Sequence, residues 1–345
     1  MVKTKKSIPT PSVSVFHSRQ HIDNDNTGYD TVTLGIDTEF LFTNKDGSIV
    51  WPWIAGFPQE RKLNHPTTGD NSAFDFHGDG YATELCTSPF SCLETFVGRM
   101  GSALSWLQRE SNASSINAPP LYTIPATVVK SAPGEAKLLG CMPSMNVYGD
   151  SGKPTSLKEN VRTTGCHLHV SHSILKSTEV CANLVKWADI LVGSTWTYIS
   201  PNTKTSEARR RKAYGRAGEF RLKDYGHGYI GVEYRVLPGT PIHHPAFLTL
   251  MFNLYRHALY YAINFGEPDK ALTSEAKIAI NTANAELAEQ VIMPHLQTSR
   301  DKQFLQYLHK TKLQPLNLDA WIKYGVYGNG HQHLAYNLMN KRVIK

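Results

Sequence analysis

The sequence predicts an α+β protein, with antiparallel strands and interspersed helices followed by a C-terminal third that is mainly helical. Three observations support this fold class. Short segments such as 31–42 and 163–171 alternate polar and apolar residues, which is the period of a strand. Apolar residues over 178–199 recur at helical spacing. From residue 245 the spacing is helical almost throughout, over 246–265 and 274–291.

The first part of the chain is interpreted as a tail followed by a hairpin. Residues 1–28 are polar and basic and are expected to form a mobile tail. A single domain is expected over 29–345, with its helical part, 245–345, packed on the rest. Residues 31–42 form its first strand, and the Asp46-Gly47 turn signal predicts a returning strand over 49–54.

The middle of the chain alternates between strands, helices and loops. Residues 75–87 are glycine-rich and then strand-like, and a capping pair, Ser91 and Glu94, opens a helix that ends near residue 110. The stretch 111–160 is rich in Ser, Pro, Gly and Asn and is expected to hold short strands or a lid. The basic segment 209–223 is interpreted as a loop that leads into a strand at 232–236.

Composition excludes several classes of protein. The 345 residues are 41% hydrophobic, which allows a large core and argues against global disorder. The five cysteines are odd in number and lack C-x-x-C spacing, so free thiols in a reducing compartment, the cytoplasm, are expected. No apolar run is long enough to cross a membrane, and the lysines near the start precede no apolar signal segment.

The charge balance favours an anionic ligand. The net charge is +7 and the pI about 9.0. Basic residues cluster in one segment that contains a single acid, Glu219, which favours a local phosphate site over a nucleic-acid surface; nucleic-acid binding stays open as an alternative. The segment's basic residues are Arg209, Arg210, Arg211, Lys212, Arg216, Arg221 and Lys223.

Charged residues, most of them acidic, are paired on two predicted strands. Asp37 and Glu39 are two residues apart, and so are Glu233 and Arg235. Residues i and i+2 of a strand point to the same face, so each strand directs two charged groups to one side. Clustered carboxylates repel one another unless a cation neutralises them. Together with Glu84 they predict a divalent metal site, and oxygen ligands favour Mg²⁺ or Mn²⁺ over Zn²⁺.

Two histidines and the arginines extend this pattern. His167 and His169 share one face of a predicted strand that follows Gly165. His167 is interpreted as a metal ligand, and His172 as structural because it has the opposite strand parity. Arginine presents a planar fork that matches phosphate oxygens. Divalent cations with arginines around phosphates are the usual components of phosphoryl transfer.

The order of these motifs resembles that of the glutamine-synthetase-like superfamily. Within it, residues from about 30 to 240 are most similar to the phage-encoded carboxylate–amine ligases, the type 2 amidoligases. The motifs are Gly35-x-Asp37-x-Glu39-Phe40, Asp79-Gly80-x-x-x-Glu84-Leu85, Gly165-x-His167-x-His169-Val170, the arginine-rich segment and Glu233-x-Arg235.

The resemblance implies an antiparallel sheet with metal ions and ATP on one face and helices on the other. It implies that one Mg²⁺ or Mn²⁺ ion binds Glu39, Glu84 and a third carboxylate, Asp79 or Asp75. A second ion would bind Asp37, His167 and Glu233. Catalytic roles would fall to Arg235, Glu233 and Arg216, and ATP contacts to Arg209, Arg210, Arg216, Arg221 and His169.

The implied reaction joins a carboxylate to an amine through an acyl-phosphate, at the expense of ATP. An amino acid, a peptide or a modified base could supply the amine. The chain departs from glutamine synthetases in three ways: it has Asp37 where they have glutamate, and no counterpart of their β-grasp domain or of the loop that guards ammonium. Ammonia is therefore not expected as the amine. The enzyme alternatives are a metal-dependent hydrolase and a guanidino-kinase-like phosphotransferase.

Overall fold

The structure is a computed structural model. It describes residues 32–57, 59, 63–64, 74–91, 93–137, 144–149, 157–158, 160–225, 230–296 and 299–312. The predicted tail over 1–28 and the C-terminal residues from 313, which include His331 and His333, lie outside the described residues.

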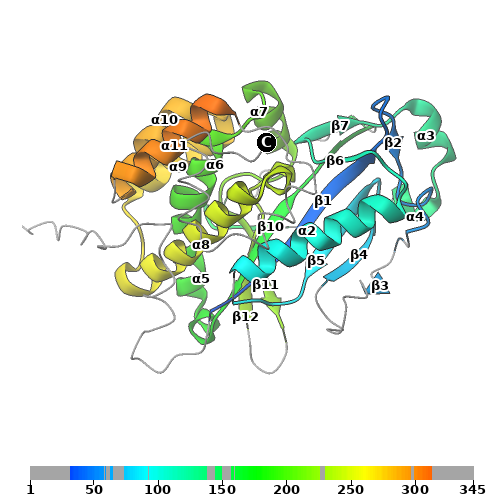
Figure 1. The fold of residues 1–345 in the computed structure, drawn as a ribbon. Helices are drawn as coiled ribbons and strands as arrows, with labels where there is room; N and C mark the ends of the chain where they lie inside the picture. Colours follow the sequence, from blue (N-terminus) through cyan, green and yellow to red (C-terminus); the bar gives the residue numbers. More distant parts are fainter. Residues whose placement is uncertain are drawn as a thin grey trace, which may run out of the picture.

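The described residues form an α+β fold around a large antiparallel sheet (Figure 1), as the sequence predicts. The main sheet runs in the order β3-β4-β5-β1-β10-β12-β11-β8, and β2 and β6 also pair with β1. Its strands are β1 (Thr33–Thr43), β2 (Ile49–Val50), β3 (Leu63–Asn64), β4 (Phe74–Asp79), β5 (Ala82–Thr87), β6 (Ser115–Asn117), β8 (Met145–Asn146), β10 (Cys166–Ser171), β11 (Glu219–Asp224) and β12 (Ile230–Tyr234). A second, two-stranded sheet pairs β7 (Leu121–Thr123) with β9 (Val161–Thr163).

Helices lie at most of the predicted positions, but the single helix predicted over 274–291 is two helices, α9 (Lys270–Thr282) and α10 (Ala285–Ile292), separated at Ala283, whose φ is 48°. The sheet packs against α2 (Leu93–Glu110), α5 (Thr178–Ala188) and α8 (Pro245–Phe265), and α2 and α8 run side by side in Figure 1. The remaining helical elements are α3 (Ala126–Ser131), α4 (Gly134–Lys137), η1 (Ser173–Lys176), η2 (Asp189–Gly193), α6 (Ser194–Ile199), α7 (Lys204–Ala213), η3 (Thr240–His243), η4 (Met293–His295) and α11 (Ser299–Thr311).

The main sheet has one apolar face, which forms the core with the helices. The side chains of Ile36, Leu168 and Val232 belong to one large cluster of buried apolar residues, together with helical residues such as Phe252. Tyr255 of α8 also donates a hydrogen bond of 3.0 Å to the carbonyl oxygen of Val232. Because side chains alternate along a strand, the intervening polar residues point to the opposite face.

The predicted hairpin and helix are present but are modified locally. Gly47 turns the chain with a φ of 81°, and β2 pairs Phe42 with Val50. The strand predicted over 49–54 ends at Val50, since Pro52 cannot donate to the ladder. The helix predicted over 178–199 is continuous, with a π-helical segment, η2, in its middle.

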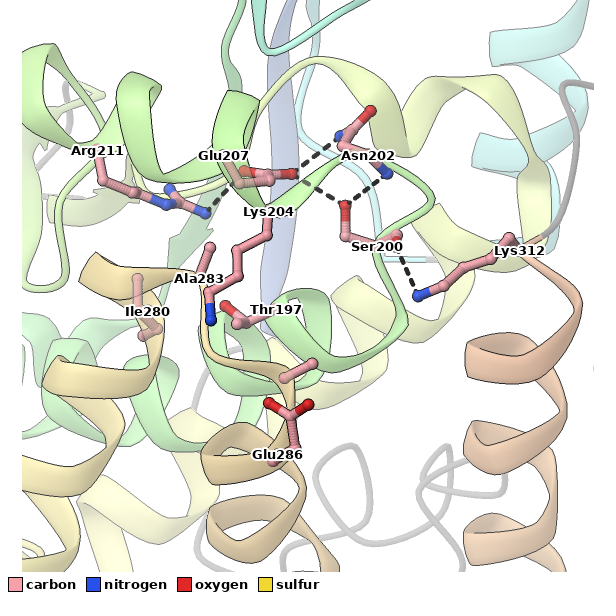
Figure 2. Close-up of a pocket in the computed structure, with 11 residues that line it drawn as sticks. Thr197, Ser200, Asn202, Lys204, Glu207, Arg211, Ile280, Ala283, Glu286 and Lys312 are labelled. Atoms are coloured by element: carbon pink, nitrogen blue, oxygen red, sulfur yellow. Dashed lines mark hydrogen bonds and ion pairs between the residues drawn. The ribbon is translucent and has the colours of Figure 1, made fainter.

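The structure corrects the prediction of a basic loop over 209–223. The first part of that segment belongs to α7, which Thr203 caps by accepting a hydrogen bond from Ser206 N, and the last part forms β11. Figure 2 shows how Glu207 fixes α7 to the chain after α6. Its buried Oε1 accepts hydrogen bonds from Ser200, Asn202 and Trp196. These tertiary contacts outweigh the polar composition that suggested a loop.

Candidate metal and phosphate site

Charged side chains from six strands share the second face of the main sheet. Directly opposed residues of neighbouring strands lie on the same face, and the strand register pairs the predicted residues with one another. The polar face is defined by the pairs His77–Glu84, Glu84–Glu39, Asp37–His167, His169–Glu233 and Glu233–Arg221. The structure thus brings together residues that are up to 196 positions apart in the chain, Asp37 and Glu233.

A cluster of carboxylates occupies one end of the polar face. Glu39 is buried, and burial together with the charges of Asp79 and Glu84 raises its pKa to about 8. Burial and the charge of Glu84 likewise raise the pKa of Asp79 to about 6. Ionising all three carboxylates is therefore unfavourable without a cation. A divalent ion with oxygen ligands would neutralise these charges. Because the charge of Asp79 acts on Glu39, Asp79 is favoured over Asp75 as the third ligand.

Gly165 allows the carboxylate of Glu39 and the ring of His167 to approach the same backbone. Its N–H donates a hydrogen bond of 2.9 Å to Oε2 of Glu39. A Cβ atom at this position would lie 2.5 Å from Nε2 of His167, which is closer than atoms pack. The glycine of the Gly165-x-His167 motif is thus required by the close approach of a side chain.

A second group of potential ligands contains His169 in the place predicted for His167. One ligand atom each from Asp37, His169 and Glu233 lies within 4.8 Å of the others, and Nε2 of His169 is 3.1 Å from Oδ2 of Asp37. Nδ1 of His169 lies 2.6 Å from the hydroxyl of Tyr225. The geometry therefore favours His169 as the imidazole ligand of a second ion.

The ring of His167 lies between the side chains of Tyr214 and Glu233. Its Nε2 lies 2.7 Å from the Tyr214 hydroxyl, and its Nδ1 lies 3.4 Å from Oε1 of Glu233. Burial and the nearby Arg235 charge hold the pKa of His167 well below its usual value. The ring is therefore neutral at physiological pH.

Arg235 connects these groups at the end of β12. Its guanidinium forms an ion pair with Glu233 and donates to the Tyr214 hydroxyl, above whose ring it lies. Lys223 is 3.2 Å and Arg221 3.9 Å from the Glu233 carboxylate. The charge of Glu233 is thus balanced by protein cations.

The arginines of the basic segment separate into two groups. Arg210 is fully buried and donates to the carbonyl oxygens of Thr164, Val236 and Leu237 at 2.7–3.0 Å. Arg211 is also buried and donates to the Gly215 and Val236 carbonyls. This placement does not support the predicted contact of Arg210 with ATP, because its donors already hold the backbone.

The other basic residues remain accessible to a ligand. Arg209 is exposed on α7, and Arg216 donates a hydrogen bond to the Lys212 carbonyl. Arg221 lies on the polar face opposite Glu233. Lys223, another basic residue of this segment, shares this face, because it is two residues from Arg221 on β11.

A cavity of about 650 Å³ opens beside the second ligand group. Its lining includes Asp37, Asp75, His169, Lys223 and Tyr225. Pockets for small molecules typically enclose roughly 300–1,000 Å³, and the volume of this cavity lies within that range. Lys223 supplies a cation at the wall of this cavity.

Sequence reasoning missed several polar residues of this site. His77 alternates with Asp75 and Asp79 on β4, so strand parity alone could have placed it on the polar face. Tyr214 and Tyr225 follow α7 and β11, outside any regular period, and no pattern marked them. A second cavity, of about 220 Å³, lies away from the polar face between α6, α7 and α10 (Figure 2).

No protein family and no curated protein matches this sequence. Two solved structures show partial similarity. The complex between the prokaryotic ubiquitin-like protein Pup and its ligase PafA gives a TM-score of 0.37 at 11% identity, over 91% of this chain and 77% of that chain. A bifunctional glutathione synthetase from Pasteurella multocida gives a TM-score of 0.36 at 13% identity, over 90% of this chain and 51% of that chain. The chain thus spans about half the length of that synthetase.

Similarities of this size carry no argument about activity, so the function rests on the chemistry of the polar face. Within the described part of the chain, no helix is both long enough and apolar enough to span a membrane.

Proposed function

We propose that this protein is an ATP-dependent carboxylate–amine ligase of the glutamine-synthetase-like superfamily, similar to the type 2 amidoligases that phages encode. One observation carries the proposal: a single sheet face combines a carboxylate cluster, formed by buried Glu39 with Asp79 and Glu84, with a group of cations around Glu233. This is the combination that transfer of a phosphoryl group to a carboxylate requires.

The carboxylate cluster is the strongest reason to expect Mg²⁺ or Mn²⁺. Glu39, Glu84 and Asp79 would hold one ion, because burial and the neighbouring carboxylate charges raise the pKa of Glu39 and of Asp79. Asp37 and His169, with Glu233, would hold a second ion. When bound, such ions neutralise the charge of the phosphate oxygens during transfer.

The protein's own cations would position the phosphates. The γ-phosphate would lie near Arg235, whose planar fork suits a phosphoryl group, while Arg221 and Lys223 would hold the nucleotide in the adjoining cavity. Arg216 and Arg209 are further candidates for contacts with ATP. The buried side chain of Arg210 would act indirectly, by holding the backbone that carries Arg235.

The proposed reaction has two steps. An oxygen of the substrate carboxylate attacks the γ-phosphorus of ATP, and ADP leaves, giving an acyl-phosphate. The amine nitrogen then attacks the carbonyl carbon, loses a proton and expels inorganic phosphate. The phosphate therefore carries away one oxygen of the original carboxylate.

This oxygen transfer provides the test. The substrates are first found by screening ATP turnover against amino acids and amines. A carboxylate substrate labelled with ¹⁸O should then pass one labelled oxygen to inorganic phosphate. Unlabelled phosphate together with an amide product would indicate another route of activation. A phosphorylated product without an amide would favour the guanidino-kinase-like alternative, and turnover without nucleotide would favour the metallohydrolase.

A further inference from the structure

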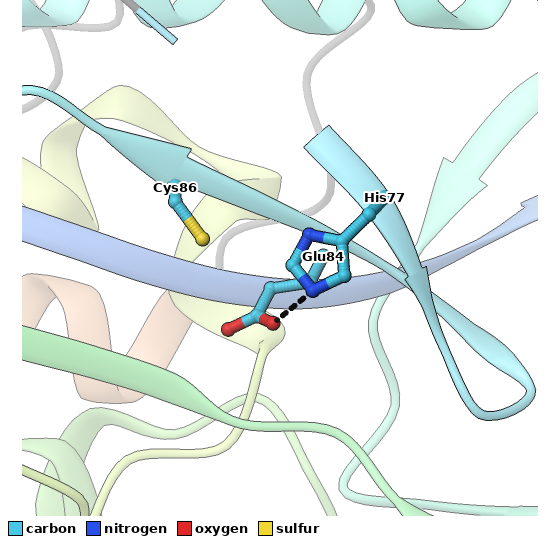
Figure 3. Close-up of side chains that lie close together, drawn as sticks. All are labelled: His77, Glu84 and Cys86. Carbon is cyan, nitrogen blue, oxygen red and sulfur yellow. Dashed lines mark ion pairs between the residues drawn. The ribbon is translucent and has the colours of Figure 1, made fainter. Parts of the chain in front are cut away.

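We propose that His77, Glu84 and Cys86 form a binding site for Zn²⁺ at the edge of the polar face. One ligand atom from each of these residues lies within 4.8 Å of the other two. Nε2 of His77 is 3.1 Å from Oε2 of Glu84. Figure 3 shows the His77 ring of β4 across the Glu84 carboxylate of β5, with the Cys86 thiol further along β5.

The strand register places the three side chains together. His77 on β4 pairs directly with Glu84 on β5, so their side chains share one face. Cys86 follows Glu84 by two residues and therefore points to the same face. The backbone ladder thus arranges the three donors before any ion binds, which reduces the ordering cost of binding.

The donor set selects a different metal from the one proposed for catalysis. A thiolate and an imidazole are preferred by Zn²⁺, whereas Mg²⁺ prefers oxygen ligands. Tetrahedral zinc with usual bond lengths separates its ligand atoms by roughly 3.3–3.8 Å. Ligand atoms within 4.8 Å of one another reach that geometry through small side-chain movements. Three protein ligands leave a fourth position for water.

Cys86 lies on the polar face of the sheet, outside the two clusters of buried apolar side chains that the described residues form. The thiol is buried, with 2% of the residue exposed. Among the described residues, however, the two clusters of buried apolar side chains do not include it, while its neighbour Leu85 belongs to the larger one. Cys86 instead lies on the polar face between Asp75 and Asp37, its direct partners on β4 and β1.

Binding requires no redox chemistry. Zn²⁺ forms a bond to Sγ of Cys86, and the thiol proton is released to the solvent. The nitrogen of His77 and an oxygen of Glu84 supply lone pairs without breaking a bond.

The site has a consequence for regulation, and only this consequence rests on the proposed ligase function. Glu84 belongs both to the zinc site and to the carboxylate cluster that would hold Mg²⁺ or Mn²⁺. A carboxylate turned towards zinc is withdrawn from the other ion. Zinc would therefore inhibit the ligase by competing for Glu84.

Cobalt provides a direct test that is independent of activity. The full-length protein, stripped of metal with a chelator, is titrated with Co²⁺, and the absorption spectrum is recorded. A thiolate ligand gives an intense near-ultraviolet charge-transfer band, which Zn²⁺ should abolish by displacing the cobalt. Cys86→Ser should remove the band, whereas Cys181→Ser, which alters a buried thiol of α5, should retain it.

A second variant guards against a folding defect in Cys86→Ser, and circular dichroism checks both. His77→Gln should retain the thiolate band but weaken Zn²⁺ binding at least about tenfold, since even residues behind the ligands cost 10–100-fold. Absence of the band in the unaltered protein, its persistence in Cys86→Ser, or unchanged zinc affinity in His77→Gln would overturn the proposal.

The inhibition is tested separately. If ATP turnover is found, zinc should inhibit the unaltered protein, and at least about tenfold more zinc should be needed to inhibit Cys86→Ser. Cobalt binding without any ATP turnover would support the proposed zinc site and contradict only the proposed ligase function. Equal inhibition of both proteins would refute the regulatory role.

Discussion

The hydroxyl of Tyr214 lies 2.7 Å from Nε2 of His167 and, at the same time, accepts a hydrogen bond from Arg235. One phenol thus joins the histidine of β10 to the arginine that follows β12. Tyr214 is a positioning residue in this arrangement, because it acts on the proposed reaction through the orientation of Arg235.

Tyr214→Phe should therefore lower kcat while KM for ATP changes little. A hydrogen bond to a charged group contributes about 1.5–3 kcal/mol, so the rate should fall by roughly 10- to 100-fold if the bond is needed in the transition state. Steady-state kinetics measure both constants. Tyr148→Phe, which removes another partly buried phenol contact, to Asp189, is the matched control. Equal effects of the two variants would remove Tyr214 from the mechanism.

Arg235→Lys tests the need for a planar fork beside the phosphates. The substitution keeps the positive charge but loses the bidentate geometry. We expect a fall in kcat on the order of 10²-fold, comparable to the loss of a strong transition-state donor. The control is Arg109→Lys, at the exposed end of α2. Near-normal turnover by the Arg235 variant would assign this residue to folding instead.

Glu39→Gln tests the carboxylate cluster through its effect on the stability of the protein without and with bound Mg²⁺. The amide keeps the shape of the side chain and removes its charge, so the metal-free variant should be at least as stable as the unaltered protein. Mg²⁺ at about 100 times its dissociation constant should stabilise the unaltered protein by about 2.7 kcal/mol, but should stabilise the variant much less. Thermal unfolding with and without Mg²⁺ measures this, with the exposed Glu110→Gln as control. A full response in the Glu39 variant would contradict the site.

Asp189 should give stability a pH dependence that is unrelated to metal binding. Burial raises its pKa from 3.8 to about 6, even though the hydroxyls of Tyr148 and Tyr234 donate to it. Between these values the folded protein binds more protons than the unfolded chain, so this group's contribution to the free energy of unfolding falls as pH rises. At 1.36 kcal/mol per pKa unit, the loss reaches about 3 kcal/mol.

Asp189→Asn should remove this slope. The free energy of unfolding of the unaltered protein minus that of the variant should be greatest near about pH 4 and should fall towards about pH 7. Urea denaturation across this range measures the difference, which also cancels the contributions of other titrating groups. A difference that stays constant with pH would show that Asp189 ionises normally in the folded protein.

The shared face of the site could be predicted from the sequence because the strand period is short and regular. Asp37 and Glu39, like His167 and His169, had to point the same way once each segment was a strand. Antiparallel pairing then aligned these faces. The choice between the two histidines could not be predicted, since it depends on Tyr214 contacting His167 and Tyr225 contacting His169.

The basic segment shows where sequence reasoning fails. Arg210 and Arg211 sit among charged residues, and their sequence gives no sign that both are buried. Their burial depends on backbone carbonyl oxygens from Thr164, Gly215, Val236 and Leu237, most of them distant in the sequence. A buried arginine is stable only with such partners, and no local pattern reveals them.

The strand order has a consequence for biosynthesis. β12 lies between β10 and β11, although it is the last of the three to leave the ribosome. Until residues 230–234 emerge, β10 has an unpaired edge, and Glu233 and Arg235 are missing beside its two histidines. Such edges invite pairing with other chains. A nascent chain stalled before this point would therefore be prone to aggregate, and its second group of ligands would lack Glu233 however well its first strands had folded.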